Sequence, residues 1–134
     1  MTIYNTMPSV DGMVDKWQPE GFRVWVWRGG WDGQELIVEV GLEISPTASL
    51  VDDVKGVINE LECPVEITAT WPDGSSERAR IGNGEMDAPG GPQNVPFRLT
   101  NHMVINCGER GVPHEVAVSL VGRPLWVNRL GPSS

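Results

Sequence analysis

Residues 63–81 read CPVEITATWPDGSSERARI, and this stretch decides the fold class. Apolar and polar residues alternate up to a Pro-Asp-Gly turn at 72–74, with the apolar set at Cys63, Val65, Ile67, Ala69 and Trp71. A period of two is typical of a half-buried antiparallel strand, and the turn residues predict a hairpin. We therefore expect Trp71 to point inward and Asp73 to form the turn.

The same two-residue rhythm recurs along most of the chain. We expect further strands at 21–27, 35–44, 75–81, 96–105, 115–121 and 125–127. Glycine and proline residues mark the connections, at 28–33, 82–94, 107–113 and 122–124. Six or seven strands with such turns predict a mainly β protein, built as an antiparallel β-sandwich or a small barrel.

The rhythm changes between residues 49 and 61, where apolar residues follow one another at spacings of three and four. This spacing predicts one short helix. Ser49 and Asp52 resemble an N-terminal capping pair, and acidic residues in the first turn suit the helix dipole. Gly56 in the middle costs about 1 kcal/mol relative to alanine, so the helix is expected to be short or broken.

The chain has 134 residues, a length typical of one domain. Residues 1–20 show little periodicity and predict an N-terminal arm, and residues 21–134 predict a single β-sandwich domain. Neither a signal peptide nor a membrane-spanning run is recognisable, which favours a cytoplasmic or virion location without membrane attachment. The net charge of −8 disfavours direct binding to nucleic acid phosphates.

A search for chemistry finds few candidates. His102, Cys107 and His114 lie close together in the sequence, and Cys63 could be a fourth metal ligand. Their spacing matches no compact zinc pattern, and His102 falls on the polar side of its strand. Two cysteines are too few for a disulfide framework, so buried free thiols are favoured over a bridge. We expect no metal, no cofactor and no catalytic residues; a zinc or thiol enzyme is the least favoured alternative.

Tryptophan is the unusual feature of the composition. Four of the six tryptophans crowd into fifteen residues, namely Trp17, Trp25, Trp27 and Trp31. Aromatic residues occur on both faces of the expected strand at 21–27, so a partner or ligand is expected to cover some of them. These four residues are the predicted binding residues of a structural or protein-interaction module, which binds a protein partner or assembles with itself. The alternative is a small-ligand or carbohydrate-binding sandwich that uses a tryptophan platform.

Four motifs resemble a family of uncharacterised bacterial immunoglobulin-like β-sandwich proteins. They are FRVWVWRGGWDG at 22–33, VEITATWPDG at 65–74, NVPFRLTN at 94–101 and GVPHEVAVSLVGR at 111–123. The resemblance implies an immunoglobulin-like sandwich and supplies no catalytic residues. The chain is also similar to small phage virion proteins of the tail tube or head–tail connection, which combine a β-sandwich or barrel with one helix and an extended arm. This second similarity implies a subunit of a larger bacterial or phage assembly.

Overall fold

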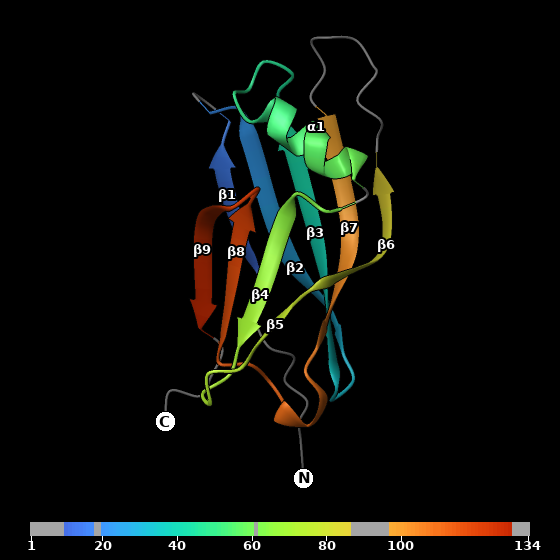
Figure 1. The fold of residues 1–134 in the computed structure, drawn as a ribbon, viewed down its shortest axis with the longest axis vertical. Helices are drawn as coiled ribbons and strands as arrows, with labels where there is room; N and C mark the ends of the chain where they lie inside the picture. Colours follow the sequence, from blue (N-terminus) through green and yellow to red (C-terminus); the bar gives the residue numbers. More distant parts are fainter. Residues whose placement is uncertain (1–9, 18–19, 61, 87–96, 130–134) are drawn as a thin grey trace.

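Two antiparallel sheets pack against each other around one core (Figure 1). The computed structural model describes residues 10–17, 20–60, 62–86 and 97–129. The larger sheet has the order β1 (Gly12–Lys16), β2 (Phe22–Trp31), β3 (Glu35–Ile44), β7 (Phe97–Asn106) and β6 (Arg80–Met86). The smaller sheet has the order β5 (Ser76–Arg78), β4 (Val65–Thr70), β8 (Glu115–Leu120) and β9 (Arg123–Arg129). The prediction of a mainly β sandwich with one short helix is confirmed, and the sheets do not close into a barrel.

The core follows from the alternation along the strands. The inward residues of β2 to β4 and of β7 and β8 are almost all apolar and buried. Trp71 is 2% exposed, and its indole Nε1 donates a hydrogen bond to the Gly111 carbonyl at 3.0 Å. Asp73 accepts hydrogen bonds from the backbone and the hydroxyl of Ser75, at 2.9 and 2.7 Å. Both residues therefore take the places that the alternation and the turn chemistry predict.

The described residues form nine strands, two more than the upper expectation. Gly12–Lys16 pairs with β2 as an edge strand, so part of the expected arm belongs to the sheet. The expected strand at 75–81 is divided between the two sheets, because the chain crosses from β5 to β6 at Ala79. Of the rest of the expected arm, residues 1–9 and 18–19 lie outside the described residues.

The expected connections at 28–33 and 82–94 are partly strand. The strand β2 continues through the glycine-rich segment at 28–33 because a bulge between Arg28 and Gly30 absorbs an extra residue. The turn comes later, where the Asp32 carboxylate accepts hydrogen bonds from the backbone of Gln34 and Glu35, at 2.8 and 2.7 Å. These bonds hold the pKa of Asp32 below its ordinary value. The strand β6 likewise extends to Met86, into the segment expected to be a loop.

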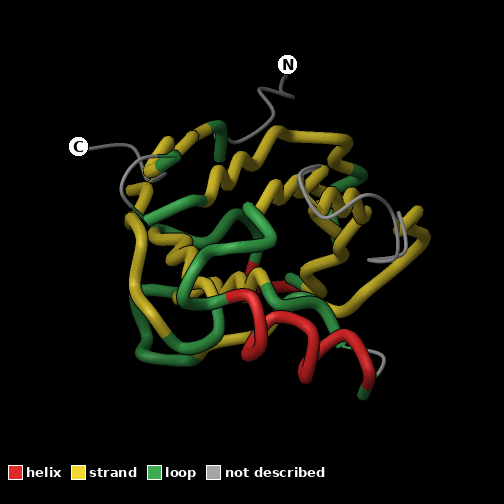
Figure 2. The backbone as a smooth tube through the Cα atoms, turned by 90° about the horizontal axis from the view of Figure 1, so that it is seen from above, coloured by secondary structure: helices red, strands yellow, loops and turns green. Residues whose placement is uncertain are grey.

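The helix α1 (Val51–Asn59) lies across the end of the sandwich that is uppermost in Figure 1 and faces the viewer in Figure 2. Val54 and Ile58 turn inward and are buried. The N-cap residue is Leu50, which makes no side-chain capping bond, so the predicted cap at Ser49 is wrong. The described part of the chain has no helix with the length and apolar character needed to cross a membrane.

The two lateral edges of the sandwich are closed in different ways. At one edge the indole of Trp126 on β9 lies against Gly12 on β1, so close that a Cβ on Gly12 would come within 2.7 Å of the ring. At the opposite edge the crossing residue Ala79 donates its backbone N–H to the Ile67 carbonyl at 2.9 Å. One edge is therefore closed by a side chain and the other by the chain itself.

Candidate interaction surface

The outer face of the larger sheet carries Trp25 and Trp27, two of the four tryptophans that were predicted to bind. Because directly paired residues of antiparallel strands point to the same face, the register places Met13, Trp25 and Gly41 side by side across β1, β2 and β3. The next row contains Trp27, Glu39 and His102. The outward side chains of β1, β2 and β3 on this face are exposed or half-buried, and Trp27 is 53% exposed.

Trp25 and Trp27 lie together on this face. Their ring centroids are 6.3 Å apart and the ring planes are inclined at 41°. The indole of Trp25 lies over Gly41, and any Cβ at that position would overlap the ring. Because Gly41 has no side chain, the indole of Trp25 can pack directly on the backbone of β3. Trp25 is therefore half-buried, whereas Trp27 is exposed.

Two aliphatic side chains extend this aromatic pair. Met13 on β1 is 58% exposed and Ile37 on β3 is 36% exposed. Ile37 precedes Glu39 on the same side of β3, at the outward positions of a strand whose inward residues form the core. We call Met13, Trp25, Trp27 and Ile37 the tryptophan face. Ile37 was visible in the sequence as an apolar residue among the polar positions of its strand, whereas Met13 depended on the unpredicted pairing of β1.

A row of charges borders the tryptophan face. Arg23 lies between Asp15 and Glu43, with contacts of 3.2 and 3.8 Å. Glu43 also accepts a hydrogen bond from Arg98 Nε at 3.0 Å. Trp17 joins this row, since the Arg23 guanidinium lies 5.3 Å from the centre of its ring. Of the predicted binding residues, Trp17 therefore sits at the border, next to the charges.

Trp31 lies on the other side of the sheet. The bulge between Arg28 and Gly30 changes which face the following residues take, and Trp31 pairs with the buried Leu36. Its side chain packs partly against the core. The structure therefore brings Trp25 and Trp27 together and separates Trp31 from them.

The candidate residues for metal and thiol chemistry are scattered. His102 is exposed and its Nε2 lies 3.1 Å from Glu39 Oε1, whereas Cys107 is fully buried. Burial raises the pKa of Cys107 to about 11 and also raises the pKa of Cys63. Both thiols are free and buried, which confirms the expectation that they are not bridged. In the described residues, no three His, Cys, Asp or Glu side chains are grouped so that they could hold a metal ion.

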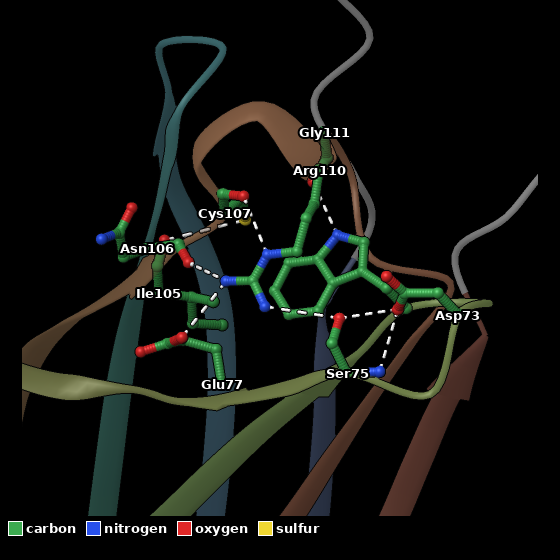
Figure 3. A network of polar contacts seen from close by, with 9 residues as sticks. Asp73, Ser75, Glu77, Ile105, Asn106, Cys107, Arg110 and Gly111 are labelled. Atoms are coloured by element: carbon green, nitrogen blue, oxygen red, sulfur yellow. Dashed lines mark hydrogen bonds and ion pairs between the residues drawn. The ribbon is translucent and has the colours of Figure 1, made fainter.

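A second polar network fixes the end of the sandwich away from α1 (Figure 3). Arg110, at the end of the 3₁₀ turn η1 (Gly108–Arg110), lies 3.8 Å from the centre of the Trp71 ring. Its guanidinium also donates to the Asn106 carbonyl at 2.9 Å and contacts Glu77 at 3.1 Å. This network connects η1 to the β4–β5 hairpin. Its polar groups bond to one another, which is typical of a structural role.

The chain was compared with protein families, curated proteins and solved structures. No protein family, curated protein or solved structure matches the chain.

Proposed function

We propose that this protein is a non-catalytic interaction module that binds protein through the tryptophan face. The observation that carries the proposal is the exposed Trp27 beside Trp25, on the outer face of the larger sheet. Tryptophan is enriched among the residues that contribute most to protein binding. A sheet face with exposed aromatic and aliphatic side chains, bordered by charges, has the apolar centre and polar rim of a protein interface.

The first partner to consider is a second copy of the chain. The bordering row contains both signs of charge, from Asp15, Arg23, Glu43 and Arg98, so two copies related by a twofold axis can face each other without a block of like charges. The strongly negative net charge opposes self-association at low salt and is screened at higher salt. A different protein is the other possible partner. An immunoglobulin-like subunit of a bacterial or phage assembly is the setting that the sequence motifs favour.

Protein is preferred to carbohydrate because of the shape of the aromatic pair. Rings inclined at 41° give a flat sugar less stacking area than coplanar rings would. Met13 and Ile37 add aliphatic surface, which a protein partner uses more fully than a sugar. Titration with a panel of oligosaccharides, followed by tryptophan fluorescence, tests the carbohydrate alternative, and saturable quenching that Trp27→Ala removes would favour it.

The test compares Trp27→Asp with Val127→Asp. Val127 is 54% exposed on β9 in the smaller sheet, so it matches Trp27 in exposure and lies outside the tryptophan face. Sedimentation equilibrium at physiological salt is expected to show concentration-dependent association of the unmodified chain and of Val127→Asp. Trp27→Asp is expected to weaken this association at least about tenfold, since truncating a central interface tryptophan costs 2 kcal/mol or more.

A partner other than a second copy is sought with a photo-crosslinking residue at position 27 or 127 in the native host. Covalent capture of one protein at position 27, and not at 127, supports the proposal. A chain that stays monomeric at about 1 mM and crosslinks equally at both positions would overturn it.

A further inference from the structure

A pocket of about 310 Å³ opens between the sheets at the β5–β6 edge, away from the tryptophan face. It exists because β5 is short. β5 pairs with β4 only over Thr68 to Thr70, and the chain then leaves for the other sheet at Ala79. The first part of β4 therefore has no neighbouring strand on that side. The space between β4 and the larger sheet is lined instead by side chains from four strands and the α1–β4 connection.

The floor of the pocket is apolar and contains sulfur. It consists of the buried residues Cys63, Val65, Ala79 and Met103, and Ile81, which is 43% exposed, also lines the pocket. Cys63 Sγ is held by the buried Asn101, whose Nδ2 lies 3.6 Å away. Sulfur atoms of methionine and cysteine pack well against aromatic rings, so this floor suits an aromatic group as well as an aliphatic one. The pocket is open to solvent, and its volume of about 310 Å³ is large enough for a ring with a short side chain.

The rim of the pocket is charged, and its two carboxylates differ in their hydrogen bonding. Glu66 accepts hydrogen bonds from Arg78 at 2.6 Å, from Ser119 Oγ at 3.1 Å and from the Gly122 backbone at 2.9 Å. Both of its oxygens are therefore engaged. Glu62, which also lines the pocket, is exposed to solvent. Two carboxylates and one guanidinium leave the rim with one net negative charge, and Glu62 is the acid placed to receive a new donor.

We propose that this pocket binds a small aromatic amine, with its ring on the sulfur-containing floor and its ammonium group at Glu62. A ring and a two-carbon amine fit within the volume, and the cation complements the negative rim. The site is independent of the tryptophan face, since Met103 points inward from β7 whereas its neighbour His102 points to the outer face.

The experiment titrates the full-length ¹⁵N-labelled chain with three probes of nearly equal size: phenethylamine, phenethyl alcohol and 3-phenylpropionate. Amide shifts of Val65, Ala79 and Met103 report the pocket, and those of Met13 and Trp27 report the outer face. We expect saturable shifts at the pocket only. The amine is expected to bind about fivefold more tightly than the alcohol, because one partly exposed ion pair is worth up to about 1 kcal/mol. The carboxylate is expected to bind most weakly.

Two exposed-acid variants test the role assigned to Glu62. Glu62→Gln is expected to remove the preference for the amine, and Glu60→Gln, a neighbouring exposed acid that does not line the pocket, is expected to retain it. Both substitutions are on the surface and leave the core unchanged. The proposal is overturned if no probe causes saturable shifts at the pocket, if the carboxylate binds most tightly, or if Glu62→Gln keeps the amine preference.

Discussion

Gly56 and Gly33 both have open space where a side chain would begin, but their backbones differ. A Cβ at either position meets no atom within 4 Å. Gly56 lies inside α1, whereas Gly33 has φ +93° in the β2–β3 turn. We predict that Gly56→Ala raises the free energy of unfolding by about 0.5–1 kcal/mol, because alanine favours the helix. Gly33→Ala should lower it by about 1 kcal/mol, because alanine disfavours positive φ.

Chemical denaturation of the two alanine variants checks this prediction. The two substitutions add the same methyl group, so any general effect of apolar surface cancels between them. Equal changes of the same sign in the free energy of unfolding would show that backbone conformation is not the cause.

For single residues, the turn-forming role of a side chain could be predicted from its neighbours in the sequence. The face of the sheet to which a side chain points could be predicted only where the strand has no bulge. Asp73 follows from the turn sequence alone, and Trp71 follows from the alternation before it. Trp31 was expected beside Trp25 and Trp27, but the bulge after Arg28 turned it toward the core. A bulge depends on how two strands pair, and glycine at 29 and 30 permits one without requiring it.

Arg110 connects elements that are distant in the sequence, namely η1, the end of β7 and the β4–β5 hairpin (Figure 3). We predict that Arg110→Ala lowers the free energy of unfolding by about 2 kcal/mol, from the lost stacking on Trp71 and the lost bond to the Asn106 carbonyl. Arg110→Lys should recover less than half of this loss, because an ammonium group cannot stack as a plane and bond as a fork.

Arg123→Ala is the matched control for Arg110. Arg123 makes a 2.7 Å ion pair with Glu20, and both side chains are partly exposed. Such a pair contributes less than about 1 kcal/mol. Thermal or urea unfolding of the three variants is the measurement. A loss at Arg123 equal to that at Arg110 would show that charge pairing, and not the arrangement over Trp71, stabilises this end of the molecule.

Among the elements, long strands were easier to predict than ends and crossings. Residues 35–44 were expected as one strand and form β3 with the same limits. The helix begins at Val51 without a side-chain cap, because Leu50 and not Ser49 precedes it. Nothing in the local sequence of residues 75–81 marks the point where the segment divides into β5 and β6. The division depends on the pairing of each half with a different sheet.

At the scale of the whole molecule, the contact between Gly12 and Trp126 joins the edge strands of the two sheets. We predict that Gly12→Ala lowers the free energy of unfolding by about 1–3 kcal/mol, because the new methyl group collides with the indole. In a Trp126→Leu background the same substitution should cost at least about 1 kcal/mol less, since the smaller side chain leaves room.

The four chains of this double-mutant cycle are compared by urea denaturation. Gly30→Ala serves as the control, because the nearest atom to its added Cβ is Ile37 Cδ1 at 4.0 Å, an ordinary contact. Additive effects at positions 12 and 126 would mean that the edge is not closed by this contact.

The sequence by itself determined that this chain is built of two-faced strands around one core, because the alternation of apolar and polar residues is a local property. It also indicated that tryptophan is the unusual feature near the start of the domain. The tertiary structure alone decided that Trp25 and Trp27 share an open face while Trp31 does not, and that a pocket lies beside β4. Those outcomes depend on strand order, register and the bulge in β2, which arise from pairing between residues far apart in the chain.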